Sequence, residues 1–322
     1  MVDSMRKFLL KRLLLSIPVF IGITIFVFVL SNLAPGNPAE VLAASIEGLT
    51  EEGYEQLKIS LGLDKPVFVR YLIWLKDLLH GDLGISTRTN QPVIQMLKDR
   101  LGPSLILTMS SLVVSLVISI PLGVVSACKQ KSIWDYFSSI LAFFGASAPN
   151  FFVSLVLIYF VAVKCGLLPA SGMYNSGENP NLPSLIRHLI LPMNVLVLQL
   201  VGSFIKQTKG SVLDVLHEDY IKTARAKGIR ESAVVVRHAF RNALIPIVTS
   251  IGLRVPFLVG GAVITEQIFA WPGIGSLMVS SINTRDYNTI MGVTVLISGT
   301  VIVVNILLDC LYTIIDPRIS RN

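Results

Sequence analysis

The sequence predicts an all-α membrane protein, a bundle of six transmembrane helices with an ordered insertion after the first of them. Hydrophobic residues make up 52% of the 322 residues, charged residues make up 15%, and the mean hydropathy is +0.69. A soluble domain has nearer ~25% charged residues. The charges are also clustered, which leaves long uncharged stretches between them. This composition excludes a soluble enzyme, a nucleic-acid reader and a disordered tail.

Six apolar runs are long enough to cross a membrane. They cover residues 13–39, 101–128, 136–163, 188–205, 242–265 and 287–308. About 18 or more residues in a helix cross a hydrocarbon core of ~30 Å. The first run is longer than the apolar part of a signal peptide, and Pro35 after Ala34 disfavours cleavage, so we expect a retained helix. The runs also contain prolines, which a helix bundle tolerates and which either shape the contacts between helices or permit kinks: Pro121, Pro149, Pro192 and Pro256.

The short basic connections predict the orientation of the bundle. The N-terminal tail carries four Lys or Arg residues, residues 129–131 carry two, and residues 206–241 carry eight. On the other side, residues 164–187 carry two and residues 266–286 carry one. Because cytoplasmic loops are enriched in Lys and Arg, both termini are predicted to be cytoplasmic. The net charge of +7 then reflects inside loops and not an anionic ligand.

This topology divides the chain into three parts. Residues 1–39 form the tail and first helix, residues 40–100 an extracellular amphipathic insertion, and residues 101–322 a five-helix core. In the insertion, apolar residues recur at three and four positions from Phe68 to Leu79, after a helix start at Pro66 and before Gly81. A second short helix is expected from Pro92. The insertion could lie on the membrane, cover a pore, receive a partner protein or simply cap the bundle.

The long inside loop, residues 206–241, has the pattern of a helical hairpin. Glu218 and Asp219 open a short helix, Lys227 lies near its end, and Gly228 suits the left-handed position that follows. A second helix is expected over residues 231–240. The hairpin is either a rigid handle for another protein or an ordinary solvated basic loop.

Signatures of catalysis and metal binding are missing from the sequence. No Gly is followed by Lys, so there is no Walker A motif and we expect no ATP hydrolysis by this chain. The four histidines and three cysteines are scattered, so no catalytic residue, metal site or disulfide framework is predicted. Arg254, within the fifth run, is expected to face a substrate anion or an acid of a neighbouring subunit. Glu266 ends the same run on the outer side.

Several stretches together resemble a known family. Residues 218–228 read Glu-Asp-Tyr-Ile-Lys-Thr-Ala-Arg-Ala-Lys-Gly, and residues 237–246 read Arg-His-Ala-Phe-Arg-Asn-Ala-Leu-Ile-Pro. This is similar to the coupling loop, or EAA loop, of bacterial ABC importer permeases in the dipeptide, oligopeptide and nickel branch. Lys222 and Thr223 depart from the general pattern in the way typical of that branch. Further agreement lies in residues 61–93, in Thr-Glu-x-Ile-Phe-x-Trp-Pro-Gly-Ile-Gly at 265–275 and in Asp-Pro-Arg at 316–318.

The resemblance implies a fold and two groups of site residues. The fold is that of a type I ABC importer permease, here the first or "B-type" subunit. The coupling helix that sits in an ATPase cleft would comprise Glu218, Asp219, Tyr220, Ala224, Arg225, Ala226, Lys227 and Gly228. Contacts with a binding protein would involve Gly81, Asp82, Leu83 and Gly84. The resemblance offers no role for Arg254, which stays a candidate for the pore.

The resemblance also implies partners. A second related permease would complete the pore, one or two ABC ATPases would hold ATP and Mg²⁺, and an extracellular binding protein would deliver substrate. The surroundings would be lipid of the bacterial inner or plasma membrane, with no nucleic acid and no cofactor bound by this chain.

Two other classes of function are left as alternatives. A self-contained secondary transporter or channel would show coupling acids, broken helices or internal repeats, and a membrane anchor would leave the hairpin unexplained. Within the importer reading, the substrate is expected to be a di- or oligopeptide, with nickel or another small solute as the alternative. Arg254 favours a substrate with a carboxylate, since it would repel a bare divalent cation.

Overall fold

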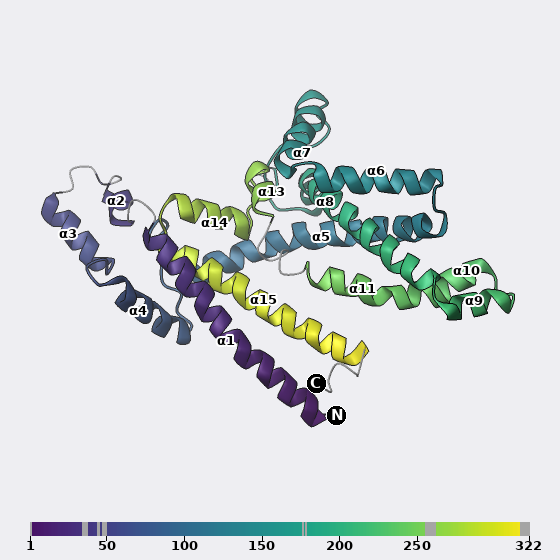
Figure 1. The fold of residues 1–322 in the computed structure, drawn as a ribbon. Coiled ribbons are helices and arrows are strands. Elements are labelled where there is room, and N and C mark those ends of the chain that lie inside the picture. The colour runs from purple at the N-terminus through teal and green to yellow at the C-terminus, as the bar shows by residue number, and fades with distance from the viewer. Residues whose placement is uncertain are drawn as a thin grey trace. The chain divides into compact units, whose positions relative to one another are not determined.

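The computed structural model describes residues 2–33, 38–43, 46, 50–175, 177, 179–254 and 262–315. Helices dominate this part of the chain, and its one β feature is an isolated bridge between Ile85 and Pro92 (Figure 1). The helices of the first part of the chain are α1 (Val2–Leu33), α2 (Pro38–Ala43), α3 (Glu51–Ser60), α4 (Val67–Leu79), α5 (Val93–Cys128), α6 (Ile133–Ser147), α7 (Asn150–Leu157) and the π-helical η1 (Ile158–Lys164). The later helices are α8 (Leu182–Leu216), α9 (Asp219–Ala226), α10 (Glu231–Ala233), the π-helical η2 (Val234–Phe240), α11 (Arg241–Gly252), α13 (Val263–Ile268), α14 (Ile274–Asn283) and α15 (Tyr287–Ile315).

The described residues hold five candidate membrane spans, or six if one bent pair of helices counts as a single span, against the six predicted runs. Five are single stretches of helix, and the sixth is the pair α6 and α7–η1, whose two halves meet at 103°. Pro149 lies at this bend as the residue before α7. A proline cannot continue the hydrogen-bond ladder of α6, so its missing N–H explains the bend at this position, where the sequence left a kink as one of two alternatives.

Two predicted boundaries were wrong. The short helix expected from Pro92 is the beginning of α5, which runs without a break to Cys128, so residue 100 lies inside a helix. The fifth run does not form one helix to Thr265, because α11 ends at Gly252 and Arg254 follows in a turn. Pro256, and the Asp-Pro-Arg stretch at 316–318, lie outside the described residues.

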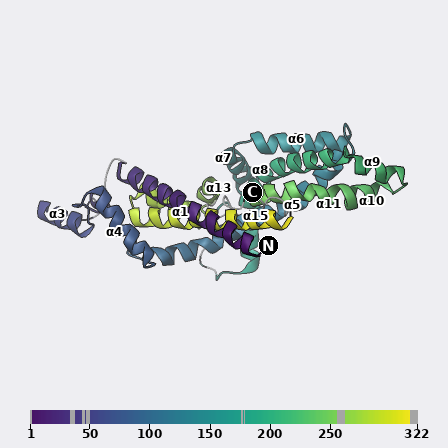
Figure 2. The same ribbon diagram turned by 60° about the horizontal axis from the view of Figure 1, so that its bottom comes forward.

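The described residues fall into two compact units, one within residues 1–103 and 273–313 and the other mainly within residues 104–272. In the first unit, the end of α1 packs on α4 and on the start of α15, through Phe28, Tyr71, Trp74 and Met291. The hydroxyls of Thr24 and Tyr71 share a hydrogen bond of 3.0 Å. The turned view in Figure 2 again shows α1 running along α15.

The apolar face of α4 differs in part from the predicted one. Tyr71 is buried as expected, but Phe68 and Leu79 are 70% and 81% exposed. Trp74 is 8% exposed, although it is not in the predicted stripe, which consists of Phe68, Tyr71, Leu72, Leu75, Leu78 and Leu79. The stripe predicted which residues are apolar, whereas the position of α1 decides which of them are covered.

The second unit is built around α8, which carries many of its buried residues. Helix α6 crosses α8 at two glycines, where an added Cβ on Gly145 would lie 2.2 Å from the Leu198 carbonyl oxygen. A Cβ on Gly202 would lie 2.6 Å from the Ala142 carbonyl oxygen. Farther along, α8 and α11 pack on the end of α5 through Val212, Ala243 and Ala127.

Candidate functional site

The predicted inside hairpin forms as a two-faced unit. Helix α9 buries Ile221 and Ala224 against Val234 and Ala239 of the following segment, with Val215 and Leu216 at its edge. The remaining side of α9 is exposed and polar. The buried pair lies three residues apart, on one face of the helix. The hairpin is therefore a packed element that presents a single polar face to its surroundings.

The two ends of α9 have the chemistry that the sequence indicated. Glu218 is the residue before the helix and Asp219 is in its first turn, where negative charge is favoured by the helix dipole. At the other end Gly228 has φ +75°, and its N–H donates to the Arg225 carbonyl at 2.9 Å. The left-handed conformation of Gly228 allows the chain to turn from α9 toward α10.

An ion pair closes the hairpin on its exposed side. Arg225 donates two hydrogen bonds to the Glu231 carboxylate, from Nε at 3.1 Å and from Nη2 at 2.6 Å. These bonds raise the pKa of Arg225 above its ordinary value. A bidentate pair fixes the relative orientation of two elements more strictly than a single contact does. The pair therefore holds α9 and α10 at one angle.

Other residues of the predicted coupling helix stay on the surface. Tyr220 is 43% exposed and accepts a hydrogen bond from the Asn242 side chain at 2.9 Å, which ties α9 to α11. Ala226 and Lys227 are exposed. Because η2 and α11 continue from α10 without a gap, the hairpin is joined directly to the fifth span. A push on α9 can thus reach a membrane helix through covalent and packed contacts.

An ionic cluster that the sequence did not predict joins three helices of the second unit. Asp135 at the start of α6 accepts hydrogen bonds from Lys209 of α8 at 2.5 Å and from Ser126 of α5 at 2.5 Å. The backbone N–H of Lys131 donates to the same carboxylate at 2.9 Å. The sequence signal was an acid at the end of an apolar run, but nothing in the spacing identified its partner 74 residues away.

Arg254 does not meet an acid among the described residues. Its Nη2 donates to the Ser203 hydroxyl of α8 at 2.8 Å, and the residue is half-buried in the turn after α11. A charged group satisfied by one neutral hydroxyl keeps most of its guanidinium donors free for another acceptor. The expectation that Arg254 faces a substrate is neither supported nor opposed by this geometry.

Glu266 is fully buried. Its carboxylate accepts a hydrogen bond from the Ser104 hydroxyl at 2.7 Å, and its backbone carbonyl accepts from the Trp271 N–H at 2.8 Å. Trp271 is itself fully buried against Leu107 and Leu196. The Thr-Glu-x-Ile-Phe-x-Trp stretch is thus largely an internal element of the second unit.

The Gly-Asp-Leu-Gly stretch of the outer insertion forms a compact turn. Gly81 and Gly84 have φ +79° and +76°, and the Asp82 carboxylate accepts a hydrogen bond from the Gly84 N–H at 2.7 Å. Leu83 is buried in a cluster with Val93 of α5. Of the four predicted contact residues, Leu83 is therefore covered, while Gly81 and Asp82 are exposed.

A buried acid holds the rest of this turn. Asp286, 1% exposed, accepts hydrogen bonds from the Ser86 hydroxyl at 2.5 Å and from the Thr289 hydroxyl at 2.7 Å. The side chain of Asn288 donates to the Ile85 carbonyl at 2.8 Å. The turn is thereby anchored to the start of α15.

Among the described residues there is no group of three or more His, Cys, Asp or Glu that could hold a metal ion.

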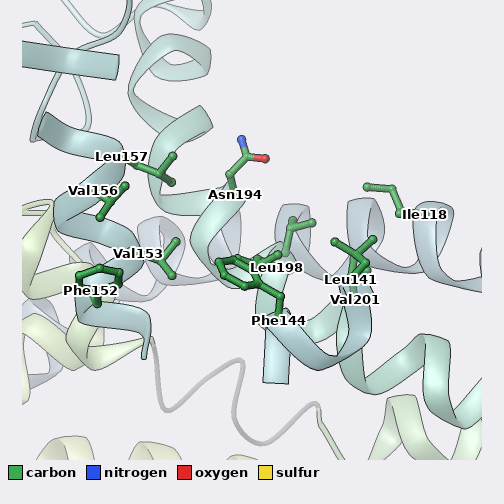
Figure 3. A pocket seen from close by; sticks show the side chains of 11 residues that line it. Ile118, Leu141, Phe144, Phe152, Val153, Val156, Leu157, Asn194, Leu198 and Val201 are labelled. Carbon is green, nitrogen blue, oxygen red and sulfur yellow. The ribbon is translucent and has the colours of Figure 1, made fainter. Parts of the chain in front are cut away.

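A groove of about 380 Å³ lies in the second unit between α5, α6, α7 and α8 (Figure 3). Its lining is apolar apart from Asn194, whose side chain donates to the Ile190 carbonyl at 2.7 Å. Phe144 and Phe152, both labelled in Figure 3, are 55% and 57% exposed. A surface of this kind suits acyl chains or another apolar helix, not a polar solute.

Comparison with known proteins agrees with this architecture. Residues 119–321 match the family model of the binding-protein-dependent transport system inner membrane component, and residues 5–110 match the N-terminal model of the same systems. The chain belongs to this family of transport permeases. The oligopeptide transport system permease protein AppB of Bacillus subtilis is 41% identical over 98% of this chain and 100% of its own. The dipeptide transport system permease protein DppB of Escherichia coli K12 is 38% identical over 98% and 99%.

Solved structures agree at the level of the fold. A chain of the MetNI methionine ABC transporter, in inward-facing conformations, superposes with a TM-score of 0.51 at 19% identity, over 71% of this permease and 96% of that chain. The fold of the permease is therefore that of a type I ABC importer subunit, as the resemblance implied. It is a membrane protein of a transport system, and its family role is to form the membrane part and not to carry out chemistry.

Proposed function

We propose that this permease forms half of the translocation pore of an ATP-driven importer for di- or oligopeptides. The observation that carries the proposal is the full-length similarity to permease proteins of dipeptide and oligopeptide transport systems. A second related permease would complete the pore, an extracellular binding protein would deliver the peptide, and one or two ABC ATPases would bind ATP and Mg²⁺. The chain lies in the cytoplasmic membrane with both termini inside.

The hairpin of α9 and α10 is the element through which the ATPases act. Its polar face is exposed, its apolar face is packed, and η2 and α11 connect it directly to the fifth span. ATP can shift the pore between two conformations only if the ATPases bind one of them more tightly. The hairpin transmits that preference because the Arg225–Glu231 pair and the buried face of α9 make it move as one body.

The partners give the first test. The tagged chain is purified in mild detergent from its native host, and co-purifying proteins are identified by mass spectrometry. We expect a sibling permease and one or two proteins with Walker A motifs. Reconstituted with the binding protein in liposomes, the complex should import peptides when ATP is inside. A chain that is recovered alone, with and without crosslinking, would instead support the secondary transporter or channel.

Arg254 is proposed as a pore residue that attracts the carboxylate of the peptide. Its bond to Ser203 leaves further donors on the guanidinium. Arg254→Gln should raise the KM for peptides with a free carboxylate more than the KM for their amides. Arg187→Gln, at an exposed site near the start of α8 and outside the hairpin, is the control. Unchanged KM values for both peptide forms would remove Arg254 from the substrate path.

A further inference from the structure

A cavity of about 680 Å³ lies within the first unit, apart from the hairpin and from Arg254. Its walls come from the end of α1, the end of α3, α4, the turn after α4 and the start of α15. The volume is within the range of ~300–1,000 Å³ that is typical of small-molecule sites. On the topology proposed above, these elements lie on the extracellular side of the membrane.

Two residues that line this cavity each carry a buried hydrogen-bond donor without an acceptor among the described residues. Trp74 is 8% exposed, and its buried indole N–H has no partner in the described part of the chain. The same holds for the buried Nε of Arg70, although Nη2 of this guanidinium donates to the Asn32 side chain. The two residues are four apart on α4 and so share one face of the helix. Both line the cavity.

The hydrogen-bonding chemistry of these two residues indicates which class of ligand the cavity would bind. An indole N–H and a guanidinium can only donate, and buried donors are nearly always paired in proteins. An oxyanion such as a carboxylate can accept from both, and a charged acceptor makes the stronger bonds. Burial lowers the pKa of Arg70, which reflects the poor solvation of its charge. Lys65 on the same wall adds a second positive charge.

The opposite charge lies farther along the same helix. Asp77 lines the cavity seven residues after Arg70, and Asp82 follows in the turn, where its carboxylate already accepts from the Gly84 N–H. Seven residues of helix rise about 10.5 Å. Three extended residues span about 10 Å. Apolar side chains of Phe28, Leu57 and Met291 also line the cavity.

We propose that this cavity is an outer subsite for a short peptide of two or three residues. Arg70 and Trp74 bind its C-terminal carboxylate, and Asp77 faces its ammonium group. The inference rests on the proposed import of peptides, and it adds a site on the permease itself that a peptide meets outside the pore. A phosphate of a lipid headgroup has the same acceptor chemistry at one end but lacks the ammonium group at the right distance.

Binding of trialanine to the complex of permeases and ATPases in phosphatidylcholine nanodiscs, without the binding protein, tests the subsite by calorimetry. We expect trialanine amide, which lacks the carboxylate, to bind at least 10-fold more weakly. Arg70→Gln and Trp74→Phe should each weaken trialanine binding by at least 10-fold and remove the difference between acid and amide. Arg88→Gln and Trp134→Phe, at exposed sites outside the cavity, should leave both values unchanged.

Each contrary result has a distinct meaning. Equal binding of acid and amide to the wild-type complex, or unchanged binding by Trp74→Phe, would overturn the subsite. Loss of trialanine binding when phosphatidylglycerol replaces phosphatidylcholine would assign the cavity to a lipid and overturn it as well. Trp74→Phe keeps an aromatic ring beside Tyr71, so a folded variant is available even if Arg70→Gln fails to assemble. Absence of peptide uptake by the wild-type complex would count against the proposed function, whereas uptake with an unchanged KM in both variants would count against the subsite alone.

Discussion

Gly228 shows how one backbone angle can decide the shape of the inside hairpin. Its φ of +75° is in the left-handed region, yet an added Cβ would meet no atom within 4 Å. A side chain here is therefore disfavoured by the backbone and not by crowding. For a residue other than glycine the left-handed conformation costs roughly 1–2 kcal/mol. A variant with a side chain at position 228 would therefore tend to leave the left-handed conformation. This change would alter the angle between α9 and α10.

We predict that Gly228→Ala lowers peptide uptake while the complex still assembles. Its ATPase activity should respond less to the loaded binding protein, because on the proposed function the altered turn moves α9 relative to the ATPases. Gly210→Ala is the matched control, since Gly210 lies within α8 and its added Cβ also meets open space. That variant should be neutral or slightly stabilising. Normal uptake and ATPase stimulation in Gly228→Ala would contradict the coupling role.

The carboxylate of Asp135 links three helices of the second unit. Asp135→Asn removes the negative charge that pairs with Lys209 and leaves the half-buried ammonium with a neutral acceptor. Breaking a buried ion pair from one side costs roughly 3–5 kcal/mol. Because Lys209 is 27% exposed and Asn still offers an amide oxygen, we expect a smaller loss of roughly 1–2 kcal/mol, seen as a lower Tm of the purified complex. The double variant Asp135→Asn with Lys209→Met should recover part of the loss, and a Tm for Asp135→Asn equal to that of the wild type would show that the pair is not formed.

At the scale of elements, the crossing of α6 and α8 depends on two glycines. A Cβ at Gly145 or Gly202 would overlap backbone oxygen atoms, which cannot rotate away as a side chain can. Overpacking of a tight contact costs roughly 1–3 kcal/mol. Gly145→Ala and Gly202→Ala should each lower the Tm of the complex, and Gly299→Ala in α15, whose Cβ would meet nothing within 4 Å, should not. Equal stability of all three variants would mean that the two helices are farther apart than described.

The elements that the sequence predicted well are those whose ends have local signals. Helix α9 was expected because acids precede it and a glycine follows it, and these signals act through the helix's own backbone groups. The end of α4 before Gly81 is of the same kind. Such ends need no information from the rest of the fold.

The elements predicted poorly are those whose boundaries were inferred from charge alone. Lys98, Asp99 and Arg100 marked the start of an apolar run, but α5 passes through them without a break. Charge reports where a membrane begins, whereas the helical hydrogen bonds continue through polar residues. The reverse error occurred at Gly252, where α11 ends although the largely apolar run, interrupted by Arg254 alone, continues in the sequence. The Asp135–Lys209 pair and the cavity beside Trp74 arise from contacts between distant segments, so no local pattern reveals them.

At the scale of the whole molecule, the distribution of basic residues predicts which side of the membrane each connection occupies. This predicted topology can be tested with two native cysteines, so no new cysteine has to be introduced. Cys128 ends α5 next to the basic residues 129–131, and Cys165 follows η1 on the sparsely charged side. Both cysteines are exposed, so both can react with a soluble reagent. The positive-inside rule places Cys128 in the cytoplasm and Cys165 outside.

We therefore predict opposite labelling of two single-cysteine variants in intact spheroplasts. A membrane-impermeant maleimide should label the variant that keeps only Cys165, and it should label the variant that keeps only Cys128 after permeabilisation alone. Inside-out vesicles should give the reverse pattern, which controls for differences in intrinsic reactivity. The reverse pattern in spheroplasts would place the α9 hairpin outside, where no ATPase could reach it. Since the bent pair α6 and α7–η1 separates the two cysteines, labelling of both from one side would show that this pair re-enters the membrane and does not cross it.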